Sequence, residues 1–74
     1  MDKYNNKKFK QEIGLQLGVI RRQLKKPIEL VAAETHLHPM TIDYLEMGES
    51  VSWKKYFQLL DYYHCQIKIL QSAQ

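Results

Sequence analysis

Cysteine, proline and glycine are scarce in this chain of 74 residues: it has one cysteine, two prolines and three glycines. The single cysteine, Cys65, excludes a disulfide within the chain, so packing or oligomerisation must supply the stability. No apolar run approaches the roughly 20 residues that span a bilayer, and the basic N-terminus leads into no apolar stretch of the signal-peptide kind. We therefore expect a protein of the reducing cytoplasm that has no membrane contact.

Motifs for metal binding and catalysis are also missing. The sequence has no CxxC and no HExxH, and His36 and His38, two residues apart across a turn, do not alone make a four-ligand site. It has no arrangement of serine, histidine and acid and no paired carboxylates, and a domain this small has little room for an enzyme cleft. We predict that the protein is not an enzyme and has no metal and no cofactor.

Charge is distributed unevenly, although the formal net charge is only +3. Residues 1–26 contain eight Lys or Arg and two Asp or Glu, whereas residues 27–48 contain four acidic residues and no Lys or Arg. Lys54 and Lys55 form a basic pair further along the chain. A polyanion would therefore contact the first segment and this pair rather than the middle of the chain.

The first periodic pattern begins after residue 8. Residues 1–8 are polar and without period, which predicts a basic flexible arm. Beyond them, apolar residues recur at spacings of four, four, three and four, as on one face of a helix. Gly14 and Gly18 lie on this helix and leave a notch where another element can approach closely. The apolar face consists of Phe9, Ile13, Leu17, Ile20 and Leu24.

Proline and glycine mark the boundaries of two short helices in the middle of the chain. Pro27 is acceptable in the first turn of a helix over 27–35. After a break of three residues, Pro39 opens a helix over 39–47, and Gly48 fits the left-handed position that ends it. The middle of the chain is therefore expected to hold two helices joined by a turn.

The C-terminal part of the chain changes period. A fourth helix is expected through about residue 63, after which apolar and polar residues alternate, which predicts a short β-strand over 65–70 and a tail over 71–74. Because the chain has no other strand, the backbone groups of this one need a partner, and a second copy is the simplest. The strand residues expected at the dimer contact are Cys65, Ile67 and Ile69.

Two short helices joined by a turn are typical of a helix-turn-helix. Ala32 provides a small residue where the helices cross, Leu37 provides an apolar plug in the turn, and the segment 42–48 ends the second helix with Glu and Gly. Together these residues resemble the Cro-type (XRE) class of helix-turn-helix domains. The resemblance implies an all-α, lambda-repressor-like domain of four to five helices over residues 9–64, followed by the short C-terminal strand.

Members of this class bind double-stranded DNA through the second short helix, here residues 39–47. In the class, an arginine of the first helix pairs with the glutamate that ends the recognition helix, which implies a structural ion pair between Arg21 and Glu46. The side chains expected to face bases are His38, Met40, Thr41 and Tyr44. The side chains expected to face phosphates are Lys7, Lys8, Lys26, Lys54 and Lys55.

Four positions depart from the class. Ile28 replaces a glutamine that often clamps a phosphate, and His36 stands where glycine is common, so it must tolerate a left-handed or similar conformation. Pro39 and Met40 stand where Gln, Ser or Arg is common. The helix therefore lacks the Arg and Gln side chains that make the strongest base contacts, and direct readout should be weak or assisted by DNA shape.

Two further resemblances indicate different partners. Residues 52–60 followed by 65–70 resemble the end of Hip-type antitoxins, which implies a homodimer and a toxin as a further partner. Residues 27–39 are similar to the helix-turn-helix of RodZ-type cell-shape proteins, in which the fold docks onto a bacterial actin instead of DNA.

We therefore expect a homodimeric transcriptional regulator, either a repressor or an antitoxin, that binds double-stranded DNA sequence-specifically. The alternative is a helix-turn-helix fold used as a protein-docking module without sequence-specific DNA binding. The basic first segment and Lys54–Lys55 favour DNA, whereas the acidic segment 27–48 favours docking.

Overall fold

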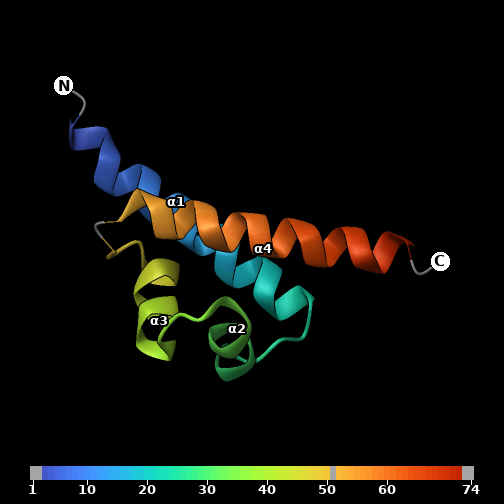
Figure 1. The fold of residues 1–74 in the computed structure, drawn as a ribbon. Coiled ribbons are helices and arrows are strands. Elements are labelled where there is room, and N and C mark those ends of the chain that lie inside the picture. The colour runs from blue at the N-terminus through green and yellow to red at the C-terminus, as the bar shows by residue number, and fades with distance from the viewer. Residues whose placement is uncertain (1–2, 51, 73–74) are drawn as a thin grey trace.

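The protein folds into helices joined by short connections. The structure is a computed structural model that describes residues 3–50 and 52–72. Within these residues it contains four helices and no strand: α1 (Lys3–Gln23), α2 (Ile28–Thr35), α3 (Pro39–Met47) and α4 (Trp53–Ser72). The predicted all-α class is confirmed. Figure 1 shows that α1 and α4 are the two long helices and that the short α2 and α3 lie together on one side of them.

Two left-handed residues end the short helices. His36, with φ 61°, follows α2, and Gly48, with φ 73°, follows α3. The Gly48 amide donates to the Leu45 carbonyl at 3.1 Å. Gly48 adopts this conformation without steric penalty, whereas His36 must tolerate it, as expected for the turn.

The core draws on all four helices. Tyr56 and Tyr63 of α4 are its largest fully buried side chains. Each fully buried aliphatic side chain contributes about 1.5–3 kcal/mol relative to an exposed one. The buried aliphatic residues are Leu17, Val31, Ala32, Ile42, Leu45 and Leu59.

α1 and α3 approach each other so closely that backbone contacts backbone. A Cβ atom added to Gly14 would lie 2.8 Å from the carbonyl oxygen of Glu46 and 2.9 Å from the amide nitrogen of Gly48. The notch predicted on the first helix is therefore occupied by the end of α3. This contact fixes the position of α3 on the domain.

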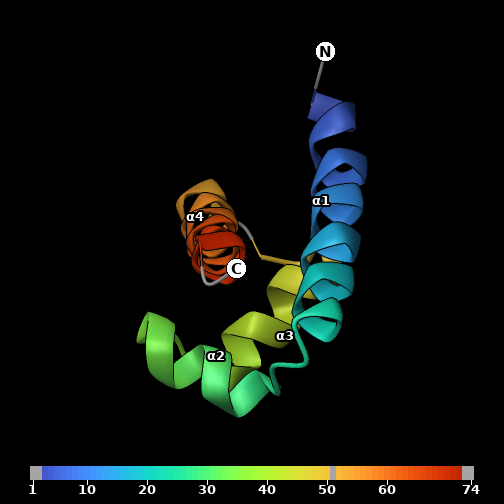
Figure 2. The same ribbon diagram turned by 90° about the vertical axis from the view of Figure 1, so that its right-hand side faces the viewer.

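The long helix α4 is tied to α2 by polar contacts. The side-chain amide of Gln58 donates to the carbonyl oxygen of Thr35 at 3.1 Å. The Tyr62 hydroxyl donates to the Glu34 carboxylate, which holds the pKa of Glu34 below its usual value, with the Lys26 ammonium as a further cause. Figure 2 looks along α4 and shows α1 on one side of it and the pair α2 and α3 below.

The predicted C-terminal strand is wrong. Residues 65–70, expected to pair across a dimer, are part of α4, which continues to Ser72. A helix satisfies its own backbone hydrogen bonds, whereas a lone strand leaves them unpaired. On this helix Ile67 and Ile69 point about 200° apart, so they do not share a face.

The expected N-terminal arm is also helical over the residues described. α1 begins at Lys3, whereas the sequence predicted a flexible arm over 1–8; residues 1–2 lie outside the described residues. The apolar periodic pattern starts only at residue 9, so the polar segment before it carries no sequence signal for a helix. Lys has good helix propensity, and it extends a helix that packing has already nucleated. The segment 71–74, expected as a tail, is helical through residue 72.

Candidate nucleic-acid interface

The outer face of α3 carries the side chains expected to face bases. Met40 and Tyr44 are 54% and 47% exposed, Thr41 is half-buried, and His38 is exposed just before the helix. Positions three and four apart on a helix lie on the same side, so these residues form one surface. The opposite face of α3 is buried in the core through Ile42 and Leu45.

His38 also shapes the beginning of α3. Its Nδ1 atom accepts a hydrogen bond from the backbone amide of Met40 at 3.0 Å, and Pro39 occupies the first turn. Since Nδ1 is the acceptor, the neutral imidazole carries its proton on Nε2 and can donate it to another group. His38 therefore caps α3 through its Nδ1 atom, and its Nε2–H group remains as a hydrogen-bond donor for another molecule.

The ion pair expected between the first helix and the end of α3 is present. The Arg21 guanidinium donates from Nε to Glu46 Oε2 at 2.6 Å and from Nη2 to Oε1 at 3.2 Å, and both side chains are 13% exposed. Its Nη1 atom donates to the carbonyl oxygen of Lys26 at 3.1 Å. The hydrogen bonding to Glu46 raises the pKa of Arg21. One arginine thus joins α1, the turn after it, and α3.

Gly18 and Tyr63 lie beside this ion pair. A Cβ on Gly18 would lie 3.2 Å from Glu46 Oε1, so glycine allows the carboxylate to lie against α1. The Tyr63 hydroxyl is buried and has no hydrogen-bond partner within residues 3–50 and 52–72. Burial, with the nearby Glu46 carboxylate as a second cause, raises the pKa of Tyr63 to about 12, so the phenol stays neutral. This cluster is structural and does not belong to the outer face of α3.

The lysines expected to face phosphates are placed in three different ways. Lys54 and Lys55 are exposed in the first turn of α4, shortly after α3 ends. Lys7 and Lys8 are exposed on α1. Lys26 is half-buried, and its ammonium lies 3.4 Å from the Glu34 carboxylate and 5.9 Å from the centre of the Tyr62 ring. Lys26 is therefore committed to contacts within the domain.

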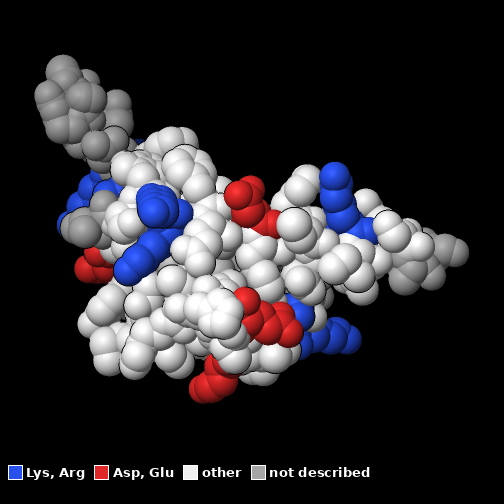
Figure 3. Space-filling model, in the orientation of Figure 1, with Lys and Arg blue, Asp and Glu red and all other residues white. Residues whose placement is uncertain are grey.

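The helix α3 itself carries no Lys or Arg, and the exposed charged side chain on it is that of Asp43. In Figure 3 the area over α3 is mostly white with red, acidic atoms at its margins, and the nearest basic atoms lie over the start of α4. Met47, 53% exposed, continues the line of Met40 and Tyr44, and Leu15 of α1, 60% exposed, lines the same shallow groove as Met47. The sequence interpretation did not include Met47 or Leu15. The spacing of Met40, Tyr44 and Met47, four and then three residues, is the signal that could have found the stripe on α3.

Comparisons of the chain with protein-family models, with curated proteins and with solved structures found no match. Within residues 3–50 and 52–72 no cluster of three or more His, Cys, Asp or Glu side chains is arranged to hold a metal ion. None of the helices over these residues has the length and apolar character needed to cross a membrane.

Proposed function

We propose that the protein is a DNA-binding transcriptional regulator of the cytoplasm that recognises a double-stranded site through α3. The observation that carries this proposal is the arrangement of α3: its inner face is buried, and its outer face presents the side chain of Thr41 together with Met40 and Tyr44. A helix of nine residues is about 14 Å long, and the major groove, about 12 Å wide, admits one.

The chemistry of the outer face suits contacts to thymine and to the backbone. Thr41 and Met40 can contact a thymine methyl group, while Tyr44 and the Nε2–H of His38 can donate to a phosphate or a base edge. Lys54 and Lys55 supply the positive charge that attracts phosphates. Since no Arg or Gln lies on α3, discrimination between bases should be modest and helped by DNA shape.

A repressor is the simplest form of this proposal, because occupancy of an operator is sufficient for repression. The antitoxin alternative depended in part on the strand over 65–70, which is helical here, so a toxin partner is less well supported. The proposed DNA binding depends instead on α3 and on the lysines near it.

Selection of bound duplexes from a random pool, repeated at two salt concentrations, tests this function. We expect enrichment of a defined sequence and an affinity that falls as salt rises, because bound lysines release counterions. Failure to bind any duplex, even at low ionic strength, would contradict the proposal.

Protein docking is the second candidate, and the outer face of α3 itself favours it. Met40, Tyr44 and Met47, with Leu15 beside them, form an apolar stripe, and Asp43 is exposed on the same helix. Such a stripe can receive an apolar partner surface. If the duplex selection fails, this docking function becomes the leading one.

A further inference from the structure

The second half of α4 extends beyond the rest of the domain. Every described residue from 67 onward is exposed, and Figure 1 shows this end of the helix running past the other three. The segment is nevertheless apolar: Ile67, Ile69 and Leu70 are 36%, 60% and 56% exposed. Short helices gain most of their stability from packing an apolar face, so this segment lacks the contact that would hold it.

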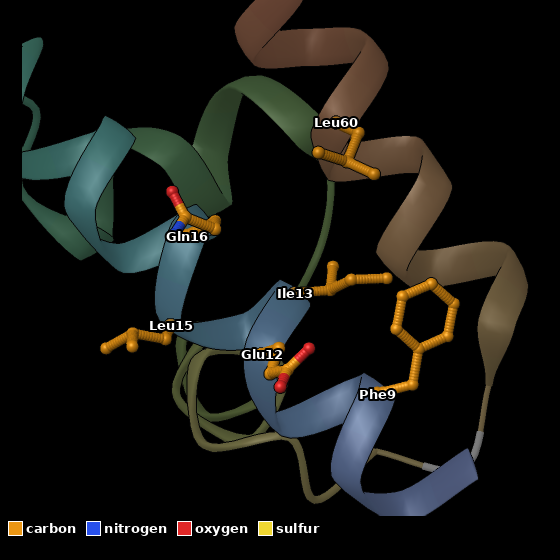
Figure 4. A pocket seen from close by; sticks show the side chains of 6 residues that line it. All are labelled: Phe9, Glu12, Ile13, Leu15, Gln16 and Leu60. Carbon is orange, nitrogen blue, oxygen red and sulfur yellow. The ribbon is translucent and has the colours of Figure 1, made fainter. Parts of the chain in front are cut away.

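An apolar groove lies between α1 and α4 on the same molecule. Its volume is about 440 Å³, and Figure 4 shows Phe9 and Ile13 of α1 and Leu60 of α4 around it. Phe57, one turn before Leu60, is 53% exposed and stacks on Trp53 with ring centres 5.8 Å apart. The groove therefore opens toward an uncovered aromatic surface and has room for aliphatic side chains.

We propose that the chain forms a two-fold homodimer in which the end of each α4 covers the groove between α1 and α4 of the other copy. If two α4 helices pair antiparallel so that Ile67 meets Leu60 of the other copy, then Leu70 meets Phe57 of the other copy. The same register brings His64 close to its own counterpart at the two-fold axis. Each copy gives and receives the same contact, as a two-fold interface requires.

A second copy accounts for both uncovered surfaces at once. A foreign helix in the groove would leave the apolar end of α4 in water, whereas two-fold exchange covers the groove together with Ile67 and Leu70 of the helix end. A second copy presents this helix end and this groove together. On this face, self-association is favoured over docking of a different protein.

Charge favours the antiparallel direction. Beyond Lys55, the acidic and basic side chains of α4 are those of Asp61, His64 and Lys68. Antiparallel pairing places each Asp61 near Lys68 of the other copy, whereas parallel pairing in register places like charges together. Glu12, which lines the groove between α1 and α4, adds a second carboxylate to the surface that the α4 end of the other copy would cover.

Sedimentation equilibrium of the full chain without DNA is the first test, so its outcome does not depend on the proposed DNA binding. We expect a dimer at micromolar concentration. Ile67→Asp should weaken it by about 100-fold or more, because the change removes an apolar side chain from both symmetric halves of the interface. Ile69→Asp, the same change about 200° around the helix, should leave the dimer intact.

Circular dichroism should show equal helix content for both variants, which separates a failure to assemble from a failure to fold. A monomeric wild-type protein, or equal weakening by the two changes, would overturn the proposed interface.

Disulfide trapping is the second test and reports the direction of pairing. In a Cys65→Ser background, His64→Cys should form a cross-linked dimer under mild oxidation, because the two positions lie near the axis. Gln71→Cys should not, since antiparallel helices would separate the two cysteines by about 22 Å, far beyond the ~7 Å limit between the Cα atoms of a disulfide. Cross-linking at both positions, or at neither, would overturn the antiparallel arrangement.

Discussion

The contact between α1 and α3 and the second half of α4 are built in opposite ways. In the first, Gly14 lets two backbones meet and Arg21 forms a bidentate pair with Glu46, so neither helix can shift alone. In the second, large apolar side chains such as Ile67 and Leu70 are exposed on the part of α4 that extends beyond the other helices. One part of the molecule is therefore closely packed within a single chain, and the other leaves large apolar side chains exposed to solvent.

The strongest test of the tight contact is Gly14→Ala. The new methyl group would press on the backbone of α3, which cannot move without unpacking the core, so we expect a loss of about 3 kcal/mol or more in the free energy of unfolding. Urea denaturation measures it. Gly18→Ala is the matched control, because its nearest neighbours, at 3.2 Å, are the side-chain ends of Arg22 and Glu46, which need to shift by only a few tenths of an ångström, and its effect should stay below about 1 kcal/mol. Equal losses would show that backbone contact is not the limiting feature.

The ion pair gives the next largest effect. Arg21→Ala should cost about 2–3 kcal/mol, because the largely buried Glu46 carboxylate would be left without its partner. Arg22→Ala, at an exposed neighbouring position, should change stability by no more than about 0.5 kcal/mol. Thermal melts of the two variants provide the comparison, and indistinguishable melting temperatures would contradict the structural role of Arg21.

Two sets of changes separate attraction to DNA from recognition of sequence. Changing both Lys54 and Lys55 to Ala should weaken binding to all duplexes and reduce the salt slope by about 0.9 for each phosphate that is no longer neutralised. Thr41→Ala should weaken the preferred site more than random DNA. Binding titrations at several salt concentrations measure both effects. An unchanged slope in the lysine variant would place the DNA-binding surface elsewhere.

The smallest effect concerns the contact between α2 and α4 and depends on pH. The Tyr62 hydroxyl lowers the pKa of Glu34, so their hydrogen bond stabilises the folded state. This contribution is fully present above pH 4.5, the ordinary pKa of the Glu34 carboxyl, and disappears as pH falls through the lowered pKa. Tyr62→Phe should therefore lower the melting temperature slightly at pH 7, and its difference from wild type should narrow in acid. Tyr44→Phe, at an exposed position, is the control. A difference that does not change with pH would exclude Glu34 as the cause.

The middle of the fold could be predicted because its signals are local and independent of one another. Proline fixes its own φ, and Gly48 adopts a conformation that other residues avoid, so the boundaries of α2 and α3 follow from single residues. The pairing of Arg21 with Glu46 followed from the family resemblance and its register with the end of the helix. These features depend on interactions within one chain.

The structure of the two ends of the chain could not be predicted, and the reason is physical. In 65–70, alternation over only three apolar residues does not distinguish a strand from a helix, because Ile67 and Leu70 also have helical spacing. Residues 1–8 are polar and show no apolar period, so they carry no sequence signal for the helix that begins at Lys3. The groove between α1 and α4 could not be predicted either, since Phe9 and Ile13 carry the pattern of a fully buried helix face.

The three-way hydrogen bonding of Arg21 has a consequence for the thermodynamics of recognition. Because one guanidinium holds α1, the carbonyl of Lys26 and the end of α3 together, the orientation of α3 is set before any ligand arrives. A partner of its outer face therefore meets a surface that needs no folding step, and association loses little free energy to ordering of the chain. Recognition by α3 should resemble the docking of a rigid body, with helix content the same before and after.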